Sequence, residues 1–459
     1  MEAQFYLFTE MKRTSIRIVV GFLMVIGVGS ILLYMLGYRN SNTDRNWTDT
    51  FFTITSGVCV TGLTVMDISS RLNLTGQIIL LIMIQIGGLG VLTISNWLAL
   101  SFTGKLNIRQ VDSSNKTLGY LYKVPTMVYL KKIITFTIII EFIGAFILFF
   151  KFLGAYDFNT ALWLAIFHSI SAFCNAGFSL FSGNLLAYNL DLTVNFTIML
   201  LIIIGGIGYL VIIDIYEYFK ARLRSRQVRL TLHSRVTLNS TAWLIFGGTI
   251  VIYFLELHNS LKNFTVFKGI IESLFLSVTS RTAGFNTIPT GQLTNMSLLV
   301  IIVLMIIGAS SGSTGGGIKT STASVFTALL KSSFKKRDNV EMYYRSVSYA
   351  DVAKVVTIIF CYFLTMIVAV TLLQVAETYG IDPRDSRGSF LEHLFEVVSA
   401  LSTVGLSTGI TSGLSNYGKY ILMFCMFAGR VGLLVLVSSV IGKQKKLMHK
   451  YPVENIMIG

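Results

Sequence analysis

The heptapeptide "SRTAGFN", from Ser280 to Asn286, places an arginine, two hydroxyl groups and a glycine between two apolar stretches. The stretch before it, "VFKGIIESLFLSVT", is too short to cross a bilayer as a helix, whereas "SLLVIIVLMIIG" after it begins a longer one. A polar turn is unusual between membrane-depth segments. Related turns recur along the chain.

Four such motifs share a glycine, with spacings of 115, 107 and 121 residues between Gly62, Gly177, Gly284 and Gly405. They read "CVTGL" (Cys59 to Leu63), "CNAGF" (Cys174 to Phe178), "RTAGF" (Arg281 to Phe285) and "STVGL" (Ser402 to Leu406). A second marker follows each: "IGGLG" (Ile86 to Gly90), "IGGIG" (Ile204 to Gly208), "IGASSG" (Ile307 to Gly312) and "AGRVG" (Ala428 to Gly432). Two markers in register four times indicate an internal repeat.

Each repeat is expected to contain a long span, a short half-helix before the motif, and a second long span. The first spans are predicted at Ile18–Leu36, Ile133–Phe150, Thr237–Leu255 and Val355–Leu373. The half-helices are predicted at Trp47–Ser56, Thr160–Ala172, Val266–Thr279 and Phe390–Leu401, and the second spans at Gln77–Ser101, Val194–Phe219, Leu298–Leu330 and Tyr420–Ile441. The repeats occupy residues 1–104, 105–220, 221–331 and 332–459, the last including the C-terminal tail.

The composition agrees with a membrane protein, because 53% of residues are hydrophobic and only 13% are charged. The first span is too long for a signal-peptide core, and no small-x-small cleavage site follows it, so we expect it to be retained. The four cysteines lie in apolar segments without a metal-binding spacing. The fold class predicted is an all-α polytopic membrane protein, with the repeats arranged pseudo-fourfold around a central pore.

Of the 37 lysines and arginines, 25 lie in five segments, including both ends of the chain. This asymmetry predicts that both termini and the connections between repeats are cytoplasmic. Orientation and attraction to anionic lipid explain most of the net charge of +15, and nucleic acid is excluded as a partner.

Irregular backbone at membrane depth is tolerated where it lines a pore, and four glycine turns around one axis can direct carbonyl oxygens at a dehydrated cation. The C-terminal end of each half-helix adds partial negative charge. The predicted filter residues are Val60, Thr61, Gly62, Asn175, Ala176, Gly177, Thr282, Ala283, Gly284, Thr403, Val404 and Gly405. Asp67 and Asp191 lie near the loop mouths, where ordinary solvated loop charge is the favoured interpretation.

The repeated unit resembles the Trk/Ktr/HKT superfamily of potassium transporters over essentially the whole chain. "QIGGLG", "SRTAGFN" and "GSTGGGIK" are most similar to the KtrB membrane subunit of its bacterial Ktr branch. The resemblance implies one potassium filter built from four loops, and a glycine in every loop favours potassium over sodium. It also implies a homodimer on a cytoplasmic ring of nucleotide-binding subunits (KtrA/KtrC-like), a bacterial cell-membrane location, no bound cofactor, and sodium as a candidate activator.

The predicted second span of repeat 3 is interrupted by "GASSGSTGGGIKTST", which begins at Gly308. Five glycines and a lysine near mid-membrane do not form ordinary helix, and the P-loop pattern fails because Ile318 precedes Lys319. A flexible kink without function is one interpretation. The favoured one, supported by the resemblance, is a mobile gating loop made of Gly308, Ala309, Ser310, Ser311, Gly312, Ser313, Thr314, Gly315, Gly316, Gly317 and Lys319.

Two arginines are placed at membrane depth, where charge is costly. Arg430 replaces the second glycine of "IGGLG"; it either pairs with Glu141 or Asp214 or, as the resemblance implies, forms an electrostatic barrier below the filter in contact with the gating loop. Arg281 is expected to point away from the pore and to pair with Glu272 or Glu396.

No catalytic set of nucleophile and base, or of paired carboxylates, appears, and His168, Glu392 and His393 are interpreted as structural. The function expected is therefore a potassium-translocating subunit and not an enzyme. The alternatives are a sodium-permeable transporter of the same architecture and, from another class, a membrane-embedded enzyme. A secondary transporter is disfavoured, because such proteins usually have inverted repeats in two halves.

Overall fold

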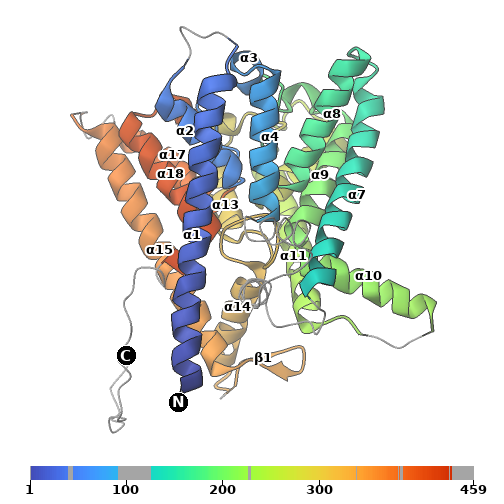
Figure 1. The fold of residues 1–459 in the computed structure, drawn as a ribbon, viewed down its shortest axis with the longest axis vertical. Helices are drawn as coiled ribbons and strands as arrows, with labels where there is room; N and C mark the ends of the chain where they lie inside the picture. Colours follow the sequence, from blue (N-terminus) through green and yellow to red (C-terminus); the bar gives the residue numbers. More distant parts are fainter. Residues whose placement is uncertain are drawn as a thin grey trace.

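The chain folds into an almost entirely helical bundle, seen in Figure 1. The structure is a computed structural model, and it describes residues 2–39, 45–90, 126–225, 229–337, 339–380, 382, 386–433 and 435–436. Helices α1 (Glu2–Leu36), α7 (Thr126–Phe152), α11 (Leu232–Glu256) and α15 (Tyr349–Thr378) each contain a stretch long and apolar enough to cross a membrane. The predicted all-α membrane fold is confirmed, and these helices coincide with the predicted first spans.

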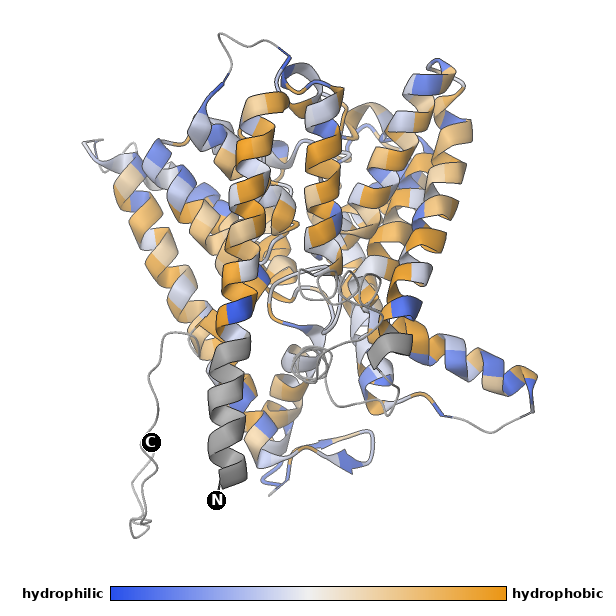
Figure 2. Ribbon diagram, viewed as in Figure 1, coloured by the Kyte–Doolittle hydropathy of each residue, from blue (hydrophilic) through white to orange (hydrophobic). Residues whose placement is uncertain are grey.

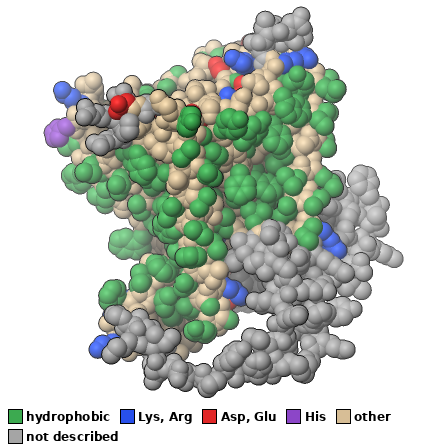
Figure 3. Space-filling model, turned by 90° about the vertical axis from the view of Figure 1, so that its left-hand side faces the viewer, with side chains coloured by type: hydrophobic (Ala, Val, Ile, Leu, Met, Phe, Trp, Pro, Cys, Tyr) green, Lys and Arg blue, Asp and Glu red, His purple; other side chains and the backbone are tan. Residues whose placement is uncertain are grey.

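The outward faces of these helices are apolar, as expected for lipid contact. Phe142 on α7, Phe246 on α11 and Phe360 on α15 are each about two-thirds exposed, at 68%, 65% and 66%. Hydrophobic residues dominate the long helices in Figure 2. On the face shown in Figure 3, hydrophobic side chains cover the middle, and charged ones lie toward its upper and lower ends.

Each long helix is followed by a shorter one that ends inside the bundle, so the four predicted half-helices are confirmed. They are α2 (Trp47–Val58), α8 (Phe158–Phe173), α12 (Val266–Thr279) and α17 (Phe390–Leu401). Asn46 caps α2 by accepting from the Thr48 N–H at 3.0 Å. Asp157 caps α8 in the same way, and hydrogen bonds from Thr160 hold the pKa of the Asp157 carboxyl below its usual value.

Each repeat continues with a second helix, and that of repeat 3 ends before Gly308, so the predicted interruption is confirmed. These helices are α4 (Leu74–Leu89), α9 (Leu192–Ile207), α13 (Asn295–Ile306) and α18 (Asn416–Val431). The continuous span predicted at 194–219 is wrong, because α9 and α10 (Tyr209–Leu223) meet at a bend of 96°. Gly208 occupies this bend with φ +96°, a conformation unfavourable for residues with a Cβ. Residues 91–101 of the second span predicted in repeat 1 lie outside the described residues, as do residues 437–441 of the one predicted in repeat 4.

Small elements connect the larger ones. They are α3 (Ile68–Arg71), η1 (Leu186–Tyr188), η2 (Thr290–Gln292), α14 (Thr320–Phe334), η3 (Arg387–Ser389), η4 (Ile410–Gly413) and a hairpin of β1 (Glu341–Met342) and β2 (Arg345–Ser346). The hairpin and α10 lie at the lower side of the molecule in Figure 1, as does the start of α1.

Polar contacts join helices from different parts of the chain. The Trp163 indole on α8 donates to the Gln77 amide oxygen on α4 at 2.7 Å. The Lys419 ammonium on α18 lies 2.8 Å from the Asp49 carboxylate on α2, with both side chains at most 14% exposed. This buried ion pair links the first and last quarters of the sequence, so the bundle closes on itself.

Candidate functional site

The four glycine motifs form backbone turns of the same kind. The residues two before each glycine have positive φ: Val60 (56°), Asn175 (59°), Thr282 (76°) and Thr403 (51°). The glycines also have positive φ, at 95° for Gly62, 70° for Gly177, 76° for Gly284 and 90° for Gly405, whereas the residues between do not. This alternation turns successive carbonyl groups toward the same side of the strand.

The four loop glycines meet one another in cyclic order. A Cβ added at Gly62 would lie 2.5 Å from the Ala176 carbonyl oxygen, one at Gly177 would lie 2.6 Å from that of Ala283, and one at Gly284 would lie 2.5 Å from that of Val404. A Cβ at Gly405 would collide with the Thr61 carbonyl oxygen and lie 2.9 Å from the Cα of Gly62. The loops therefore surround a common axis, and no side chain larger than hydrogen fits at these positions.

Hydrogen bonds direct the loop N–H groups toward the half-helices. Thr61, Ala176 and Val404 donate their N–H groups to the carbonyls of Ser56, Ser171 and Ser399 at 2.8 Å, and Ala283 donates to Thr279 at 3.0 Å. The Ser56 and Ser399 hydroxyls also accept from the N–H groups of Gly62 and Gly405. The N–H side of each loop is thus occupied at the rear, which leaves the carbonyl side for the axis.

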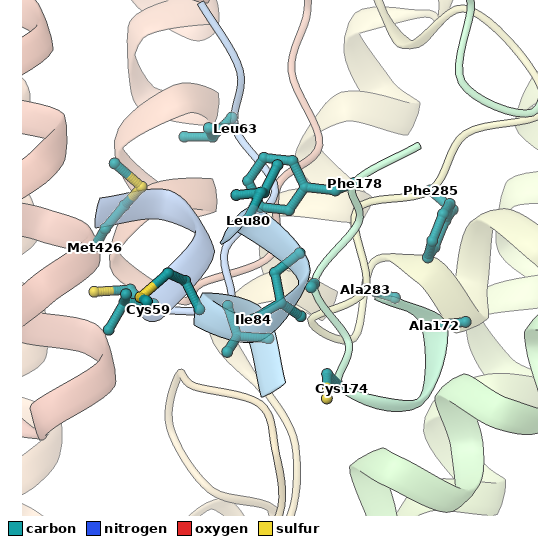
Figure 4. Packing of buried hydrophobic residues seen from close by; sticks show 14 of the residues in the cluster. Cys59, Leu63, Leu80, Ile84, Ala172, Cys174, Phe178, Ala283, Phe285 and Met426 are labelled. Atoms are coloured by element: carbon teal, nitrogen blue, oxygen red, sulfur yellow. The ribbon is translucent and has the colours of Figure 1, made fainter. Parts of the chain in front are cut away.

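Apolar packing holds the loops from behind. Figure 4 shows Leu63, Phe178 and Phe285, which follow three of the glycines, among buried side chains such as Leu80 and Ile84 of α4. Phe178 and Phe285 are fully buried. A packed rear surface restrains the distance between opposite loops, because a close-packed interior resists compression.

Polar side chains from the half-helices hold the upper parts of three loops, and sequence reasoning did not assign them this role. The His168 ring lies 2.9 Å from the Ser179 hydroxyl. One Glu396 oxygen accepts from the Ser407 hydroxyl at 2.6 Å, and Glu272 accepts from the Thr287 hydroxyl at 2.5 Å. His393 contacts Gln374 instead. These three pairs share a pattern that is visible in the sequence. Each has a polar residue on the half-helix and a hydroxyl-bearing residue two or three positions after the loop glycine.

The pairing predicted for Arg281 is wrong. Glu272 and Glu396 hold their own loops, and the guanidinium of Arg281 donates to the Thr241 hydroxyl of α11 at 3.4 Å. Arg281 is 7% exposed and points away from the loop axis toward α11, as expected. Each of these carboxylates accepts from a hydroxyl group of its own loop, and Oε1 of Glu272 has no hydrogen-bond partner among the described residues.

Above the loops lies a cavity of about 450 Å³, lined by all four loop glycines. Asp67 also lines it and caps α3 by accepting from the Ser69 N–H. Asp191 instead pairs with Lys151 at 2.6 Å. The two mouth carboxylates singled out in the sequence therefore have different surroundings.

Below the loops, residues 308–319 form an irregular segment between α13 and α14 (Figure 1). Its ends pair in parallel, with the Gly308 N–H donating to Ile318 and the Ile318 N–H to Ile306. The middle of the segment is bonded to the break between α9 and α10 through the main chain. The Ser310 N–H donates to the Gly206 carbonyl, and the Tyr209 N–H donates to the Gly312 carbonyl, both at 3.0 Å.

The tip of this segment reaches the third and fourth glycine loops from below. A Cβ added at Gly315 would collide with the Thr282 hydroxyl, and one at Gly316 with the Thr403 hydroxyl. The Lys319 ammonium donates to the carbonyls of Gly315 and Gly316 at 2.5 and 3.4 Å. Ser313 donates to Ser310 within the segment, and the Ser311 hydroxyl contacts that of Ser321 at the start of α14. Ala309 and Thr314 are buried, and Gly317 has φ +68°. The tip of the segment therefore lies directly against the third and fourth loops.

Arg430, on α18, joins this segment to the first repeat. Its guanidinium donates to the carbonyl of Thr314 and to those of Gly87 and Gly88 at the end of α4. The alternative partners are occupied: Glu141 accepts from Gln85 at 3.0 and 3.2 Å, and Asp214 accepts from Thr231. No ion pair involving Arg430 occurs among the described residues, so its charge is compensated by main-chain dipoles alone.

Comparison with known proteins points to one family. The family model "TrkH: Cation transport protein" matches residues 4–450. "Ktr system potassium uptake protein B" of Vibrio alginolyticus is 36% identical over 444 residues, covering 96% of this chain and 94% of that protein. "Potassium/sodium uptake protein NtpJ" of Enterococcus hirae is 34% identical over 451 residues, covering 96% of each chain. The structure is similar to that of the potassium transporter TrkH from Vibrio parahaemolyticus, with a TM-score of 0.68, 19% identity, and coverage of 92% of this chain and 84% of that one.

Proposed function

The chain belongs to the TrkH family of cation transport proteins, and from that premise we propose that it is the potassium-translocating membrane subunit of a Ktr-type uptake system. The observation that carries this proposal is the cyclic contact of Gly62, Gly177, Gly284 and Gly405. A ring of inward carbonyl oxygens replaces the water around a potassium ion without a charged ligand. Transport by such a ring involves no covalent reaction, so we propose no enzymatic activity.

A sodium-permeable transporter is the second candidate, because one relative is named a potassium/sodium uptake protein. Glycine in all four loops favours potassium, since each loop then adopts the same turn and contributes equivalent oxygens. Sodium as an activator is compatible with either candidate.

We propose that residues 308–319 are the gating loop. The contacts of Gly315 and Gly316 with the filter hydroxyls support a closed position for this loop. Arg430 supplies both a positive charge below the filter and hydrogen bonds that hold the loop to α4. Opening would require the loop to leave the axis, and its glycines and hydroxyl groups allow it to adopt another backbone conformation.

Ion flux into proteoliposomes tests the proposed function. We expect the purified chain to accumulate rubidium or potassium down a gradient, and sodium at a rate at least about tenfold lower, a difference of ~1.4 kcal/mol in the barrier. Liposomes with the Gly284→Ala variant serve as the control for leakage. Equal fluxes of the two ions would favour the sodium-permeable alternative, and no flux of either would contradict the proposal.

The relatives are named as components of Ktr systems, and we propose a homodimer that docks on a cytoplasmic ring of nucleotide-binding subunits. In this orientation the lower side in Figure 1, where α1 begins, faces the cytoplasm of a bacterial cell. The charge asymmetry of the sequence supports a cytoplasmic location for both termini, and the basic residues also contact anionic lipid. The ring would contact 220–235 and 331–345, where Leu223 is 88% exposed and Tyr344 is fully exposed beside lysines and arginines.

Site-directed cross-linking tests the docking surface. Cysteines introduced as Leu223→Cys and Tyr344→Cys are expected to cross-link to the regulatory subunit, because both side chains are exposed on basic cytoplasmic segments. The matched control is Trp47→Cys, since Trp47 is also exposed but lies on the opposite side of the bundle. Cross-links formed only by other segments would refute this surface.

A further inference from the structure

One side chain outside the glycine motifs contacts the filter. The amide nitrogen of Asn184 lies 3.5 Å from the carbonyl oxygens of both Gly177 and Gly284. Among the described residues, no other side chain donates a hydrogen bond to a carbonyl of the four filter glycines. Asn184 also lines the cavity above the filter. It therefore bridges the outermost carbonyls of repeats 2 and 3 at the point where ions enter.

The backbone holds this amide in place. Asn184 has φ +56°, a left-handed conformation that asparagine tolerates better than most residues, and its N–H donates to Phe181 at 3.0 Å. The next residue, Leu185, is fully buried, and its N–H donates to the Asn286 carbonyl of the third loop at 3.2 Å. The segment is thus anchored to the third loop, while its side chain reaches both loops.

We propose that Asn184 is a positioning residue that sets the discrimination between potassium and sodium at the outer end of the filter. This inference rests on the proposed function. A smaller cation is bound well only if the carbonyl oxygens move closer to the axis. An amide that donates to two neighbouring oxygens withdraws them from the ion and opposes that movement. Potassium, which fits the wider ring, is affected less than sodium.

Two variants separate the amide from the backbone turn. Asn184→Gly removes the side chain and retains easy access to positive φ, so the turn itself is preserved. Asn184→Asp retains the shape but replaces the donor with a negatively charged acceptor, so Asn184→Gly is the variant that isolates the loss of the amide. Ser182→Ala is the matched control, since Ser182 lines the same cavity without a hydrogen bond to a filter carbonyl. Each protein is reconstituted at equal abundance, and the maximal rate of rubidium uptake and its inhibition by sodium are measured.

We expect sodium to inhibit rubidium uptake about fivefold more strongly in Asn184→Gly and in Asn184→Asp, as expected from losing roughly one net hydrogen bond. The maximal rate for rubidium should change much less, and Ser182→Ala should match the unaltered protein in both quantities. Unchanged sodium inhibition in Asn184→Gly, or an equal change in Ser182→Ala, would overturn the inference while leaving the proposed function intact. Failure of the unaltered protein to take up rubidium would overturn both.

Discussion

Replacing Gly284 with alanine is expected to reduce potassium uptake at least about 100-fold, equivalent to ~2.7 kcal/mol in the transport barrier. The added Cβ would lie 2.5 Å from the Val404 carbonyl oxygen and 3.1 Å from the Cα of Gly405. Both neighbours are backbone atoms of the next loop, so relief requires a shift of the ring itself. The left-handed φ of +76° adds about 1 kcal/mol of strain for a residue with a Cβ. The measurement is rubidium uptake into a potassium-transport-deficient strain, normalised to the amount of protein in the membrane.

Gly409→Ala is the matched control for this variant. Gly409 also has a positive φ, of +106°, and lines the same cavity, but a Cβ there would meet no atom within 4 Å. It therefore carries the backbone strain without the collision, and uptake is expected to stay within about threefold of the unaltered protein. Normal uptake by Gly284→Ala at equal abundance would show that the ring is not the ion pathway.

Replacing Arg430 with methionine is expected to raise potassium flux by at least about tenfold. Two effects act in the same direction. A positive charge roughly 8 Å from a potassium ion costs about 2 kcal/mol at an effective dielectric constant of ~20, and this cost disappears. The hydrogen bonds to Thr314 and Gly87 are also lost, which releases the gating loop from α4. Flux is measured in proteoliposomes without a regulatory subunit.

Arg430→Lys distinguishes the two effects. Lysine retains the charge, but its ammonium lacks the planar fork with which arginine reaches carbonyls on two different elements. A small rise in the lysine variant and a large one in the methionine variant would assign the barrier mainly to charge. Similar rises in both would assign it to the loop contact. A flux unchanged or lowered in Arg430→Met, with the protein still folded, would contradict the proposed roles of Arg430 and of the loop.

The half-helices and the turns at the four loop glycines were predictable because they depend on local features. A half-helix is recognised by its length, which is too short to span, and by the glycine that follows. The bend at Gly208 was missed, although "IGGIG" is present, because an apolar run on both sides of a glycine reads as one continuous helix. The break removes hydrogen bonds within the helix, and the Tyr209 N–H instead donates to the Gly312 carbonyl of another repeat.

The partners of buried charges were predicted least well. Arg281 was paired by composition with Glu272 or Glu396, yet each carboxylate accepts from a hydroxyl of its own repeat. Nothing in the sequence marks Asn184 as a residue that contacts the glycine loops, because a "GN" turn in a loop is common. The two carbonyls that its amide contacts belong to its own repeat and to the adjacent one. Such pairings depend on distances between segments that are far apart in the sequence, and Asn184 and Gly284 are separated by 100 residues.

The amino-acid sequence by itself determined the membrane class, the four-fold repetition and the positions of the turns, because apolar length, charge asymmetry and glycine spacing are properties of the chain. Only the tertiary structure decided how the turns face one another, which carbonyls Arg430 and Asn184 contact, and that residues 308–319 lie against two of the turns from below. The physical reason is that burial and hydrogen-bond partners arise from the packing of repeats against one another, and a linear pattern does not contain those distances.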